Sequence, residues 1–281
     1  MIVAVIGAGT IGLSWARLFA SYGMTVRVSD PRPDLAEAVA DIPGDVQIAA
    51  SVADAVRGAD VVQENGPESL EFKKDLFTTL VRLAPAHALL LSSSSAIPSS
   101  AFTEDIEDAS RILIGHPFNP PHVLPLVEVV PGRRTSEESV QAAVAFYRSV
   151  GRTPVVERKE IPGFVGNRLQ SALSREAIFL VEQGVVTPED LDAVVMNSLG
   201  IRWAATGPFL ASHLGGGPGG YRHLMEHIGA SMREIDLGEP STDPEPLIEA
   251  VERAYGAATY EELTETRDRR QQAVMSALEQ N

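Results

Sequence analysis

The feature that most constrains the fold lies at the start of the chain, where an apolar run, residues 2–6, is followed by glycines at fixed spacing. Gly7, Gly9 and Gly12 form a G-x-G-x-x-G motif. A strand that ends in this motif turns sharply at the first glycine, admits a pyrophosphate at the second and packs against a helix at the third. The spacing therefore predicts a strand, a phosphate-binding turn and a helix over residues 10–22.

The next apolar segment, residues 25–29, reads as a second strand and leads directly to Asp30. An acidic residue at this place binds the adenosine ribose in dinucleotide-binding folds, and its charge repels a 2′-phosphate. The amides of Thr10 and Ile11, at the start of the predicted helix, are placed to bind the phosphates. These features predict NAD as the cofactor, while Arg32, close to Asp30, leaves NADP open as an alternative.

Apolar runs that read as strands alternate with segments that read as helices up to about residue 160. Further strands are expected at 46–48, 60–63, 88–91, 111–115, 126–130 and 154–157, and helices at 33–40, 52–57, 68–84 and 137–150. In the helix at 68–84 we expect Leu70, Phe77 and Leu80 to share one face. The alternation is typical of an α/β fold with a Rossmann-type, doubly wound sheet.

After residue 160 only helical patterns are found. They include a helix that opens at Pro162-Gly163, a capped helix start at Thr187 and a final helix from Tyr260. The glycine-rich stretch 215–220 is expected to be a turn between helices. The sequence therefore predicts a dinucleotide-binding domain over residues 1–160 and an all-α C-terminal domain over residues 161–281.

The composition argues against several classes of function. The chain has 281 residues and a net charge of −15, which disfavours nucleic acid or an anionic membrane as a partner. It contains no Cys, so a thiolate nucleophile or metal site is excluded, and this fits a cytoplasmic location. No run approaches the roughly 18 apolar residues of a membrane span, and the apolar N-terminus is too short for a signal sequence.

Polar residues follow several predicted strands, at the edge where doubly wound sheets bind ligands. His116 comes directly after the strand at 111–115, and Glu128 lies in the next strand along the chain. If the chain reverses between them, the carboxylate can orient the imidazole as a general base for an alcohol proton. The alternative is that His116 caps a loop and Glu128 is a charge on an edge strand.

Taken together, the motifs resemble those of the 3-hydroxyacyl-CoA dehydrogenase family. The resemblance rests on the G-x-G-x-x-G motif, Val61-Val62 with Glu64, the serine run from Ser92 to Ser95, His116-Pro117-Phe118-Asn119-Pro120, Leu126-Val127-Glu128-Val129 and Pro162-Gly163-Phe164-Val165-Gly166-Asn167-Arg168. Within the family, the chain is most similar to the branch with lambda-crystallin, gulonate 3-dehydrogenase, carnitine dehydrogenase and some polyketide-tailoring ketoreductases. The resemblance covers about residues 2–229.

The resemblance implies a role for each residue of the site. His116 is expected to move the proton, with Glu128 as its acidic partner. Ser95 would hydrogen-bond the reacting oxygen, and Asn167 would line the site from the second domain. Further residues are assigned by position: Glu64, Glu68, Lys73 and Ser92 to the neighbourhood of the cofactor, and Asn119 to the substrate. On the residues alone, ordinary structural roles remain the alternative for Ser95, Asn167, Glu68 and Lys73.

Two departures from the family bear on the substrate. In the fatty-acid-oxidation members a long helical hairpin follows the second strand and helps to hold CoA, whereas here only about 30 residues separate Asp30 from Val61. The segment Gly200 to Phe209 is longer than in the CoA enzymes and contains Arg202. Its guanidinium is suited to a free carboxylate, or else to an ion pair at a surface or interface.

The resemblance therefore implies an NAD-dependent oxidoreductase that acts at the C3 hydroxyl or oxo carbon of a 3-hydroxy or 3-oxo compound, preferably a small free acid. A ketoreductase for a polyketide or acyl thioester is the alternative within this class. A non-catalytic, crystallin-like NAD-binding protein is the alternative outside it, and the complete set of site residues argues against that role. The family also implies a homodimer formed through the helical domain. The apolar pattern over residues 164–181 is a candidate interface, with internal core as the alternative.

Overall fold

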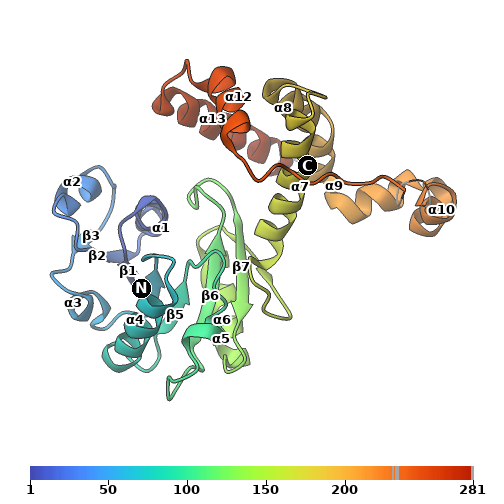
Figure 1. Cartoon of the computed structure of the whole chain (residues 1–281). Helices are drawn as coiled ribbons and strands as arrows, with labels where there is room; N and C mark the ends of the chain where they lie inside the picture. Colours follow the sequence, from blue (N-terminus) through green and yellow to red (C-terminus); the bar gives the residue numbers. More distant parts are fainter. Residues whose placement is uncertain (230, 232–233, 280–281) are drawn as a thin grey trace. The chain divides into compact units, whose positions relative to one another are not determined.

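The computed structural model describes residues 1–229, 231 and 234–279 of the chain (Figure 1). The chain divides into two compact units, Met1–Arg168 and Leu169–Asn281. The division falls within helix α7 (Phe164–Glu182), so the start of this helix belongs to the first unit. The domain boundary at residue 160 remains a prediction from the sequence.

The first unit is built on an eight-stranded sheet with the strand order β3-β2-β1-β4-β5-β6-β7-β8. Its strands are β1 (Ile2–Ile6), β2 (Thr25–Ser29), β3 (Val46–Ile48), β4 (Val61–Glu64), β5 (Leu89–Ser92), β6 (Ile112–Pro117), β7 (Leu126–Pro131) and β8 (Thr153–Val156). Strands β1 to β6 pair in parallel, and β7 runs antiparallel to β6. The strand order reverses between β1 and β4, and doubly wound sheets bind their ligands at the carboxyl ends of such strands.

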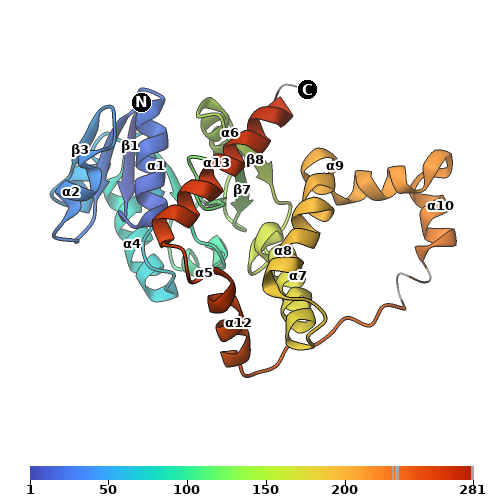
Figure 2. The ribbon, with the colours of Figure 1, turned by 90° about the horizontal axis from the view of Figure 1, so that it is seen from above.

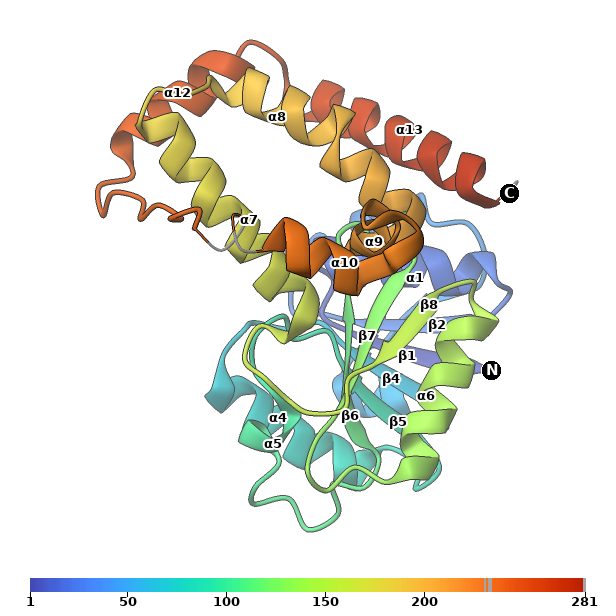
Figure 3. The same ribbon diagram turned by 90° about the vertical axis from the view of Figure 1, so that its right-hand side faces the viewer.

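Helices cover both faces of this sheet, as Figure 3 shows for α4 and α5 on one side and α6 on the other. The helices are α1 (Thr10–Ser21), α2 (Leu35–Ala40), α3 (Val52–Val56), α4 (Leu70–Leu83), α5 (Ser99–Phe102) and α6 (Glu137–Ser149). Successive strand residues point to opposite faces, so Val3 and Val5 belong to the core under α1 and α6, whereas Ala4 belongs to the core under α3 and α4. The predicted Rossmann-type fold is confirmed, although the short helix α5 was not expected.

The face of α4 that carries Leu70, Phe77 and Leu80 is buried only in part. Leu70, in the first turn of α4, is 42% exposed, whereas Phe77 and Leu80 are buried as expected. The buried face of α4 instead includes Lys73, which is 1% exposed. A lysine is buried to this degree only where a partner compensates its charge, and the partner here is Glu64 at the end of β4.

The second unit contains only helices among its described residues. They are the main part of α7, then α8 (Pro188–Asn197), α9 (Leu199–Gly215), α10 (Gly220–His227), α12 (Glu245–Tyr255) and α13 (Tyr260–Glu279). The expected cap is present, because Thr187 accepts a hydrogen bond from the amide of Asp190. The glycine-rich stretch forms a short 3₁₀ turn, Gly217–Gly219, between α9 and α10. Helix α12, which follows the extended segment visible in Figure 2, was not expected.

The second unit has no hydrophobic core of its own in the part that the structure describes. The buried apolar side chains of the described chain end at Phe164. Large apolar side chains beyond it face solvent, among them Leu169, Ile201 and Phe209, the last of which is 78% exposed. None of the described helices is long and apolar enough to cross a membrane.

Candidate active site

The glycine-rich turn after β1 has the geometry that its spacing predicts. Gly7 has a φ of +95°, which side-chain-bearing residues rarely adopt, and a Cβ there would lie 2.7 Å from the carbonyl oxygen of Asn65. At Gly12 a Cβ would lie 1.9 Å from the carbonyl oxygen of Gly7, so the start of α1 packs directly on the turn. A Cβ at Gly9 would meet nothing within 4 Å. The open face of the turn is therefore at Gly9, where a ligand can approach the backbone.

Helix α1 begins at this turn with its amides uncapped. Its N-cap, Gly9, makes no side-chain cap, and its first turn contains no acidic residue. The first amides of a helix have no partner within the helix, and the helix dipole adds positive potential at the same place. The amides of Thr10 and Ile11 can therefore hold the phosphates of a dinucleotide.

Asp30 lies immediately beyond β2 and is tied to the same turn. Its carboxylate accepts hydrogen bonds from the amides of Ala8 at 2.6 Å and Arg32 at 2.8 Å. The guanidinium of Arg32 donates to the carbonyl of Ala8 at 2.8 Å and pairs with Asp34 at 2.7 Å. Hydrogen bonds from Arg32 lower the pKa of Asp34 to about 2. Arg32 is thus already paired, and the turn with Asp30 fits the ribose and pyrophosphate of NAD.

Glu64, Lys73 and Ser92 form a polar cluster that is closed off from solvent. Lys73 Nζ lies 3.1 and 3.0 Å from the two carboxylate oxygens of Glu64, and the hydroxyl of Ser92 donates to Glu64 at 2.6 Å. The sequence placed all three beside the cofactor. Their buried side chains offer no surface to a ligand in this structure, so any role in cofactor binding would be indirect, through the strand ends that they link.

Glu68 lies at the edge of this cluster and holds the loop that contains Ser95. Its Oε1 accepts hydrogen bonds from the hydroxyl of Ser94 at 2.6 Å and from the amides of residues 95–97 at 2.9 to 3.3 Å. Burial raises the pKa of Glu68, but the hydrogen bond from Ser94 and the charge of Lys73 outweigh it, so the net shift is downward. The ionised carboxylate is therefore committed to the loop.

His116 and Glu128 face each other in the antiparallel register of β6 and β7. Nδ1 of His116 lies 2.7 Å from Oε2 of Glu128, and both side chains are buried. The other carboxylate oxygen accepts hydrogen bonds from the amides of Gly166 at 2.7 Å and Val165 at 3.1 Å. Burial raises the pKa of Glu128, but the hydrogen bonds from His116 and Gly166 outweigh it and the pKa is lowered. An ionised Glu128 therefore fixes Nδ1 as a donor.

The second ring nitrogen of His116 is available for proton transfer. Nε2 has no hydrogen-bond partner among the described residues, and it is not enclosed, because the enclosed unpaired side-chain atoms of that part of the chain are Glu157 Oε2 and Gln271 Oε1. The rings of Phe118 and Phe164 lie on His116 with centroids 5.6 and 5.5 Å away. The imidazole is thus held by a carboxylate and two apolar rings, with Nε2 open.

The segment that brings these groups together has a strained residue. Phe164, which is fully buried, has a φ of +51°, a conformation that is costly for a bulky side chain. The strain is offset where Glu128 accepts the two amides that follow, those of Val165 and Gly166. This local geometry joins the start of α7 to the carboxylate that orients His116.

Of the remaining predicted site residues, Ser95 and Asn167 lie together, whereas Asn119 and Arg202 are exposed elsewhere. The side-chain amide of Asn167 donates to the carbonyl of Ser95 at 2.9 Å, so these two are brought together. In the division into two compact units, Asn167 belongs to the first unit, not the second. Asn119 is exposed in the loop after β6. Arg202 is exposed on α9 of the second unit, and its guanidinium makes no ion pair with the described residues.

Sequence reasoning missed a polar network beneath the glycine-rich turn. The hydroxyl of Tyr147 donates to Gln63 at 2.8 Å, Gln63 donates to Ser93 at 2.9 Å, and Ser93 donates to Asn65 at 2.7 Å. The indole of Trp15 also donates to Ser93, at 3.1 Å. The available signal was an amide, Gln63, in a strand expected to be apolar. The network braces the strand ends next to the turn.

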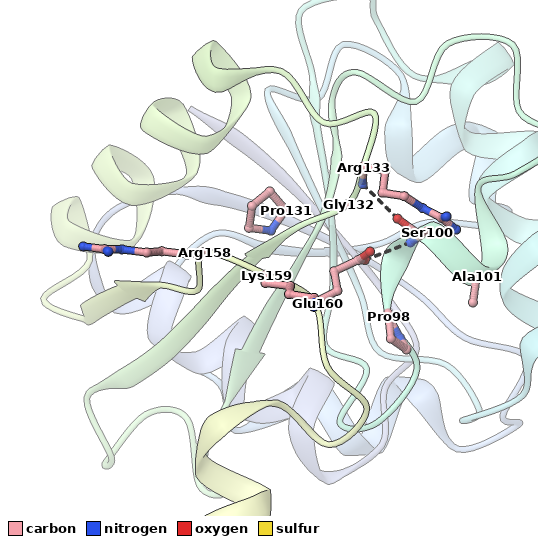
Figure 4. Close-up of a pocket in the computed structure, with 9 residues that line it drawn as sticks. All are labelled: Pro98, Ser100, Ala101, Pro131, Gly132, Arg133, Arg158, Lys159 and Glu160. Carbon is pink, nitrogen blue, oxygen red and sulfur yellow. Dashed lines mark hydrogen bonds between the residues drawn. The ribbon is translucent and has the colours of Figure 1, made fainter.

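A cavity of about 530 Å³ lies beside α5 and the segment that follows β8 (Figure 4). Arg133, Arg158 and Lys159 contribute basic side chains to its lining. Glu160, also in the lining, accepts hydrogen bonds from the hydroxyl of Ser99 at 3.1 Å and the amide of Ser100 at 2.9 Å. None of the predicted site residues lines this cavity. Among the described residues, no group of His, Asp or Glu side chains is placed to hold a metal ion.

Comparisons with known proteins identify relatives of the chain. The model of the 3-hydroxyacyl-CoA dehydrogenase NAD-binding domain matches residues 2–43 and 34–161, and the model of the C-terminal domain matches residues 163–242. A 3-hydroxyacyl-CoA dehydrogenase from Gibberella moniliformis is 42% identical over 95% of this chain and 91% of its own length. An L-carnitine dehydrogenase from Streptomyces griseus subsp. griseus is 36% identical over 95% of this chain and 87% of its own length.

A solved structure is similar over the whole chain. It is that of 5-formyl-3-hydroxy-2-methylpyridine 4-carboxylic acid 5-dehydrogenase, an NAD⁺-dependent dismutase, with a TM-score of 0.81 and 31% identity over 99% of this chain and 98% of that one. The two domain models together span most of the chain. The first covers the glycine-rich turn and the His116–Glu128 pair, and the second lies in the helical part that follows. The chain therefore belongs to the 3-hydroxyacyl-CoA dehydrogenase family and is an NAD-dependent oxidoreductase.

Proposed function

We propose that the protein oxidises or reduces the C3 carbon of a small, free 3-hydroxy or 3-oxo acid, with His116 as the proton carrier. The observation that carries the proposal is the buried hydrogen bond between His116 and Glu128. Ionised Glu128 stabilises the imidazolium, and the open Nε2 takes the hydroxyl proton in oxidation or returns it in reduction. When bound, NAD supplies the hydride chemistry.

Ser95 and Asn167 are proposed to position the reacting oxygen. Glu68 fixes the backbone around Ser95, and Asn167 holds the carbonyl of the same residue. The hydroxyl of Ser95 makes no hydrogen bond with the described residues and is free to donate to a substrate oxygen. Gly7, Gly9, Thr10, Ile11, Gly12 and Asp30 are proposed to bind the cofactor, with Arg32 beside them.

A free acid is proposed as the substrate because the chain lacks a long helical hairpin between β2 and β4. The helices there, α2 and α3, contain only six and five residues. The names of the Streptomyces relative and of the solved structure are those of enzymes acting on free acids, whereas the Gibberella relative is named for an acyl-CoA. We propose Arg202 as the guanidinium that binds the substrate carboxylate.

The test is NADH formation with matched pairs of substrates, each pair consisting of a 3-hydroxy acid and its CoA thioester. The proposal expects a higher kcat/KM for the free acid and a raised KM for that acid in Arg202→Gln, with kcat little changed. The rate of NADH formation with His116→Gln gives the background rate for each reaction. Faster turnover of the thioesters would instead favour the acyl thioester alternative, which the Gibberella relative supports.

We further propose that the protein is a homodimer assembled through its second unit, and that it acts in the cytoplasm. The dimer proposal is supported by the missing core of that unit, where apolar side chains such as Leu169 and Phe209 face solvent in the single chain. Apolar surface of this extent marks a contact with another protein. The cytoplasmic location is supported by the absence of Cys from the sequence.

A further inference from the structure

A second carboxyl group, that of Glu157, lies next to the His116–Glu128 pair. Glu157 follows β8, and its side chain is only 6% exposed. Its Oε1 accepts a hydrogen bond from the amide of Val165 at 2.8 Å, and the same amide lies 3.1 Å from Oε1 of Glu128. Two oxygens that share one nitrogen at these distances are within about 6 Å of each other, close enough for strong charge coupling.

The buried region around Glu128 and Glu157 has too few hydrogen-bond donors for two carboxylates. Glu128 receives hydrogen bonds at both oxygens, but Oε2 of Glu157 is enclosed and has no partner in the part of the chain that the structure describes. An unpaired, buried carboxylate oxygen is costly, and the cost falls when the carboxyl takes up a proton. The cluster therefore has a place for a proton in addition to the one that His116 moves.

The ionisable groups that face Glu157 are Glu128 on β7 and His116 on β6, while the start of α7 contributes amides. Arg158 and Lys159, next along the chain, are exposed and line the cavity of Figure 4. Burial raises the pKa of Glu157, and the charge of Glu128 raises it further. The pKa of Glu128 is shifted in the opposite direction. Two neighbouring carboxyls with opposite shifts share a proton unequally, with Glu157 as its holder.

We propose that Glu157 is a third ionisable member of the proton-transfer site, a positioning residue that adjusts the proton affinity of His116 through Glu128 without touching the substrate. The inference rests on the proposed role of His116. While Glu157 is protonated, the cluster has a single negative charge, which matches one imidazolium. When Glu157 ionises, the second negative charge favours the imidazolium form of His116.

The decisive variant is Glu157→Gln, which keeps the shape of the side chain and removes its ionisation. Oxidation requires neutral His116, so kcat/KM rises with pH as His116 loses its proton. In Glu157→Gln this rise should move to lower pH by about 1 unit, because the variant cannot acquire the negative charge that Glu157 gains on ionising in the wild type. Glu157→Asp, which retains a carboxyl group, should restore part of the shift. Glu160→Gln is the matched control in the same segment and should follow the wild-type profile.

A second readout separates this inference from the proposed function. The pKa of His116 can be measured by NMR titration of histidine-labelled protein, with the signal assigned by its loss in His116→Gln. A downward shift in Glu157→Gln, seen in the titration and in the pH profile, supports both proposals. A shift in the titration alone supports the coupling and overturns His116 as the proton carrier. Titration curves that coincide for wild type and Glu157→Gln overturn the inference.

Thermal unfolding establishes that Glu157→Gln is folded before either comparison is made. Should this variant not fold, the carboxyl carbon of Glu157 in the wild-type protein can be titrated by NMR. A pKa above the usual range of a glutamate supports the inference. A pKa within that range overturns it, because Glu157 would then hold no proton in the cluster and its charge would stay constant while His116 titrates.

Discussion

At the scale of the residue, the partner of each buried carboxylate decides whether it serves the fold or the chemistry. Glu64 is paired with Lys73, and the pair is closed off from solvent. Glu128 is paired with an imidazole, which has one nitrogen open and can take up and release a proton. The first arrangement links β4 to α4, whereas the second can store and release a proton.

The central prediction at this scale concerns His116. His116→Gln should slow turnover by roughly 100- to 10,000-fold, the range of general acid or base catalysis, while the Kd for NADH stays nearly unchanged. Glu128→Gln should also slow turnover, because a neutral amide does not favour the imidazolium. The double variant should lose less than the product of the two losses, since both residues serve one proton transfer.

These rates are measured beside His87→Gln, a control whose side chain is 64% exposed and distant in sequence from the dyad. The control should match the wild type. Normal turnover in folded His116→Gln would defeat the mechanism, and loss of NADH binding in that variant would instead indicate a structural histidine.

Asp30 provides the second prediction, which concerns the choice between NAD and NADP. Its charge should repel a 2′-phosphate, and the nearby Arg32 is paired with Asp34. Asp30→Asn with Asp34→Asn removes the repulsion and releases the guanidinium. The ratio of kcat/KM for NAD over NADP should therefore fall by about tenfold, or ~1.4 kcal/mol. Steady-state rates with both cofactors give the ratio, and a wild-type preference for NADP would contradict the assignment.

At the scale of the element, the presence of each strand was predictable, although His116, expected directly after its strand, lies within β6. The contents of the buried helix faces were less predictable. Each predicted strand of the first unit is present, because a short apolar run between turn residues has few other structures available. Lys73 was not expected in the core, although it lies four residues before Phe77 and therefore on the same face of α4. A hydrophobic pattern does not reveal that a charged residue is buried when the partner of that residue lies on a strand distant in the sequence.

The segment from Glu157 to Gly166 was beyond prediction for a related reason. Its path depends on the positive φ of Phe164, a conformation that local propensity disfavours, and on amides that bond to Glu128 from far away in the sequence. The meeting of His116 with Glu128 was foreseen only on the condition that the chain reverses between them. The antiparallel pairing of β6 with β7 meets that condition.

The glycine-rich turn allows a prediction at the scale of the element. It compares two variants, Gly12→Ala and Gly9→Ala, each of which serves as the control for the other. Gly12→Ala should destabilise the fold by about 1–3 kcal/mol, because its Cβ would overlap the backbone of Gly7. Gly9→Ala should leave the unfolding temperature nearly unchanged, since its Cβ would meet nothing within 4 Å. The same methyl group would obstruct a pyrophosphate, so the Kd for NADH should rise about tenfold or more, equivalent to ~1.4 kcal/mol. Thermal unfolding and NADH fluorescence titration measure the two effects, and unaltered NADH binding in Gly9→Ala would contradict the proposed phosphate site.

At the scale of the whole molecule, the two units differ in how they are stabilised. The first unit buries two apolar clusters, one on each face of its sheet. The second unit has six α-helices among its described residues but none of the buried apolar side chains of the described chain. Helices gain most of their stability from packing an apolar face, and the exposed apolar side chains of this unit are the surface through which we propose that it associates.

The homodimer proposed through the second unit would supply such a surface, and it gives the last prediction. Leu169 and Leu173 lie one helical turn apart on α7 and are 62% and 38% exposed. Leu169→Glu with Leu173→Glu should convert the dimer to a monomer at micromolar concentration, because two charges would have to be buried without partners. Ile48→Glu, a similar change at a 49%-exposed position on β3, is the control and should leave the dimer intact. Light scattering after size-exclusion chromatography measures the mass; a monomeric wild-type protein over this range would remove the proposal, and a dimer in both variants would move its interface away from α7.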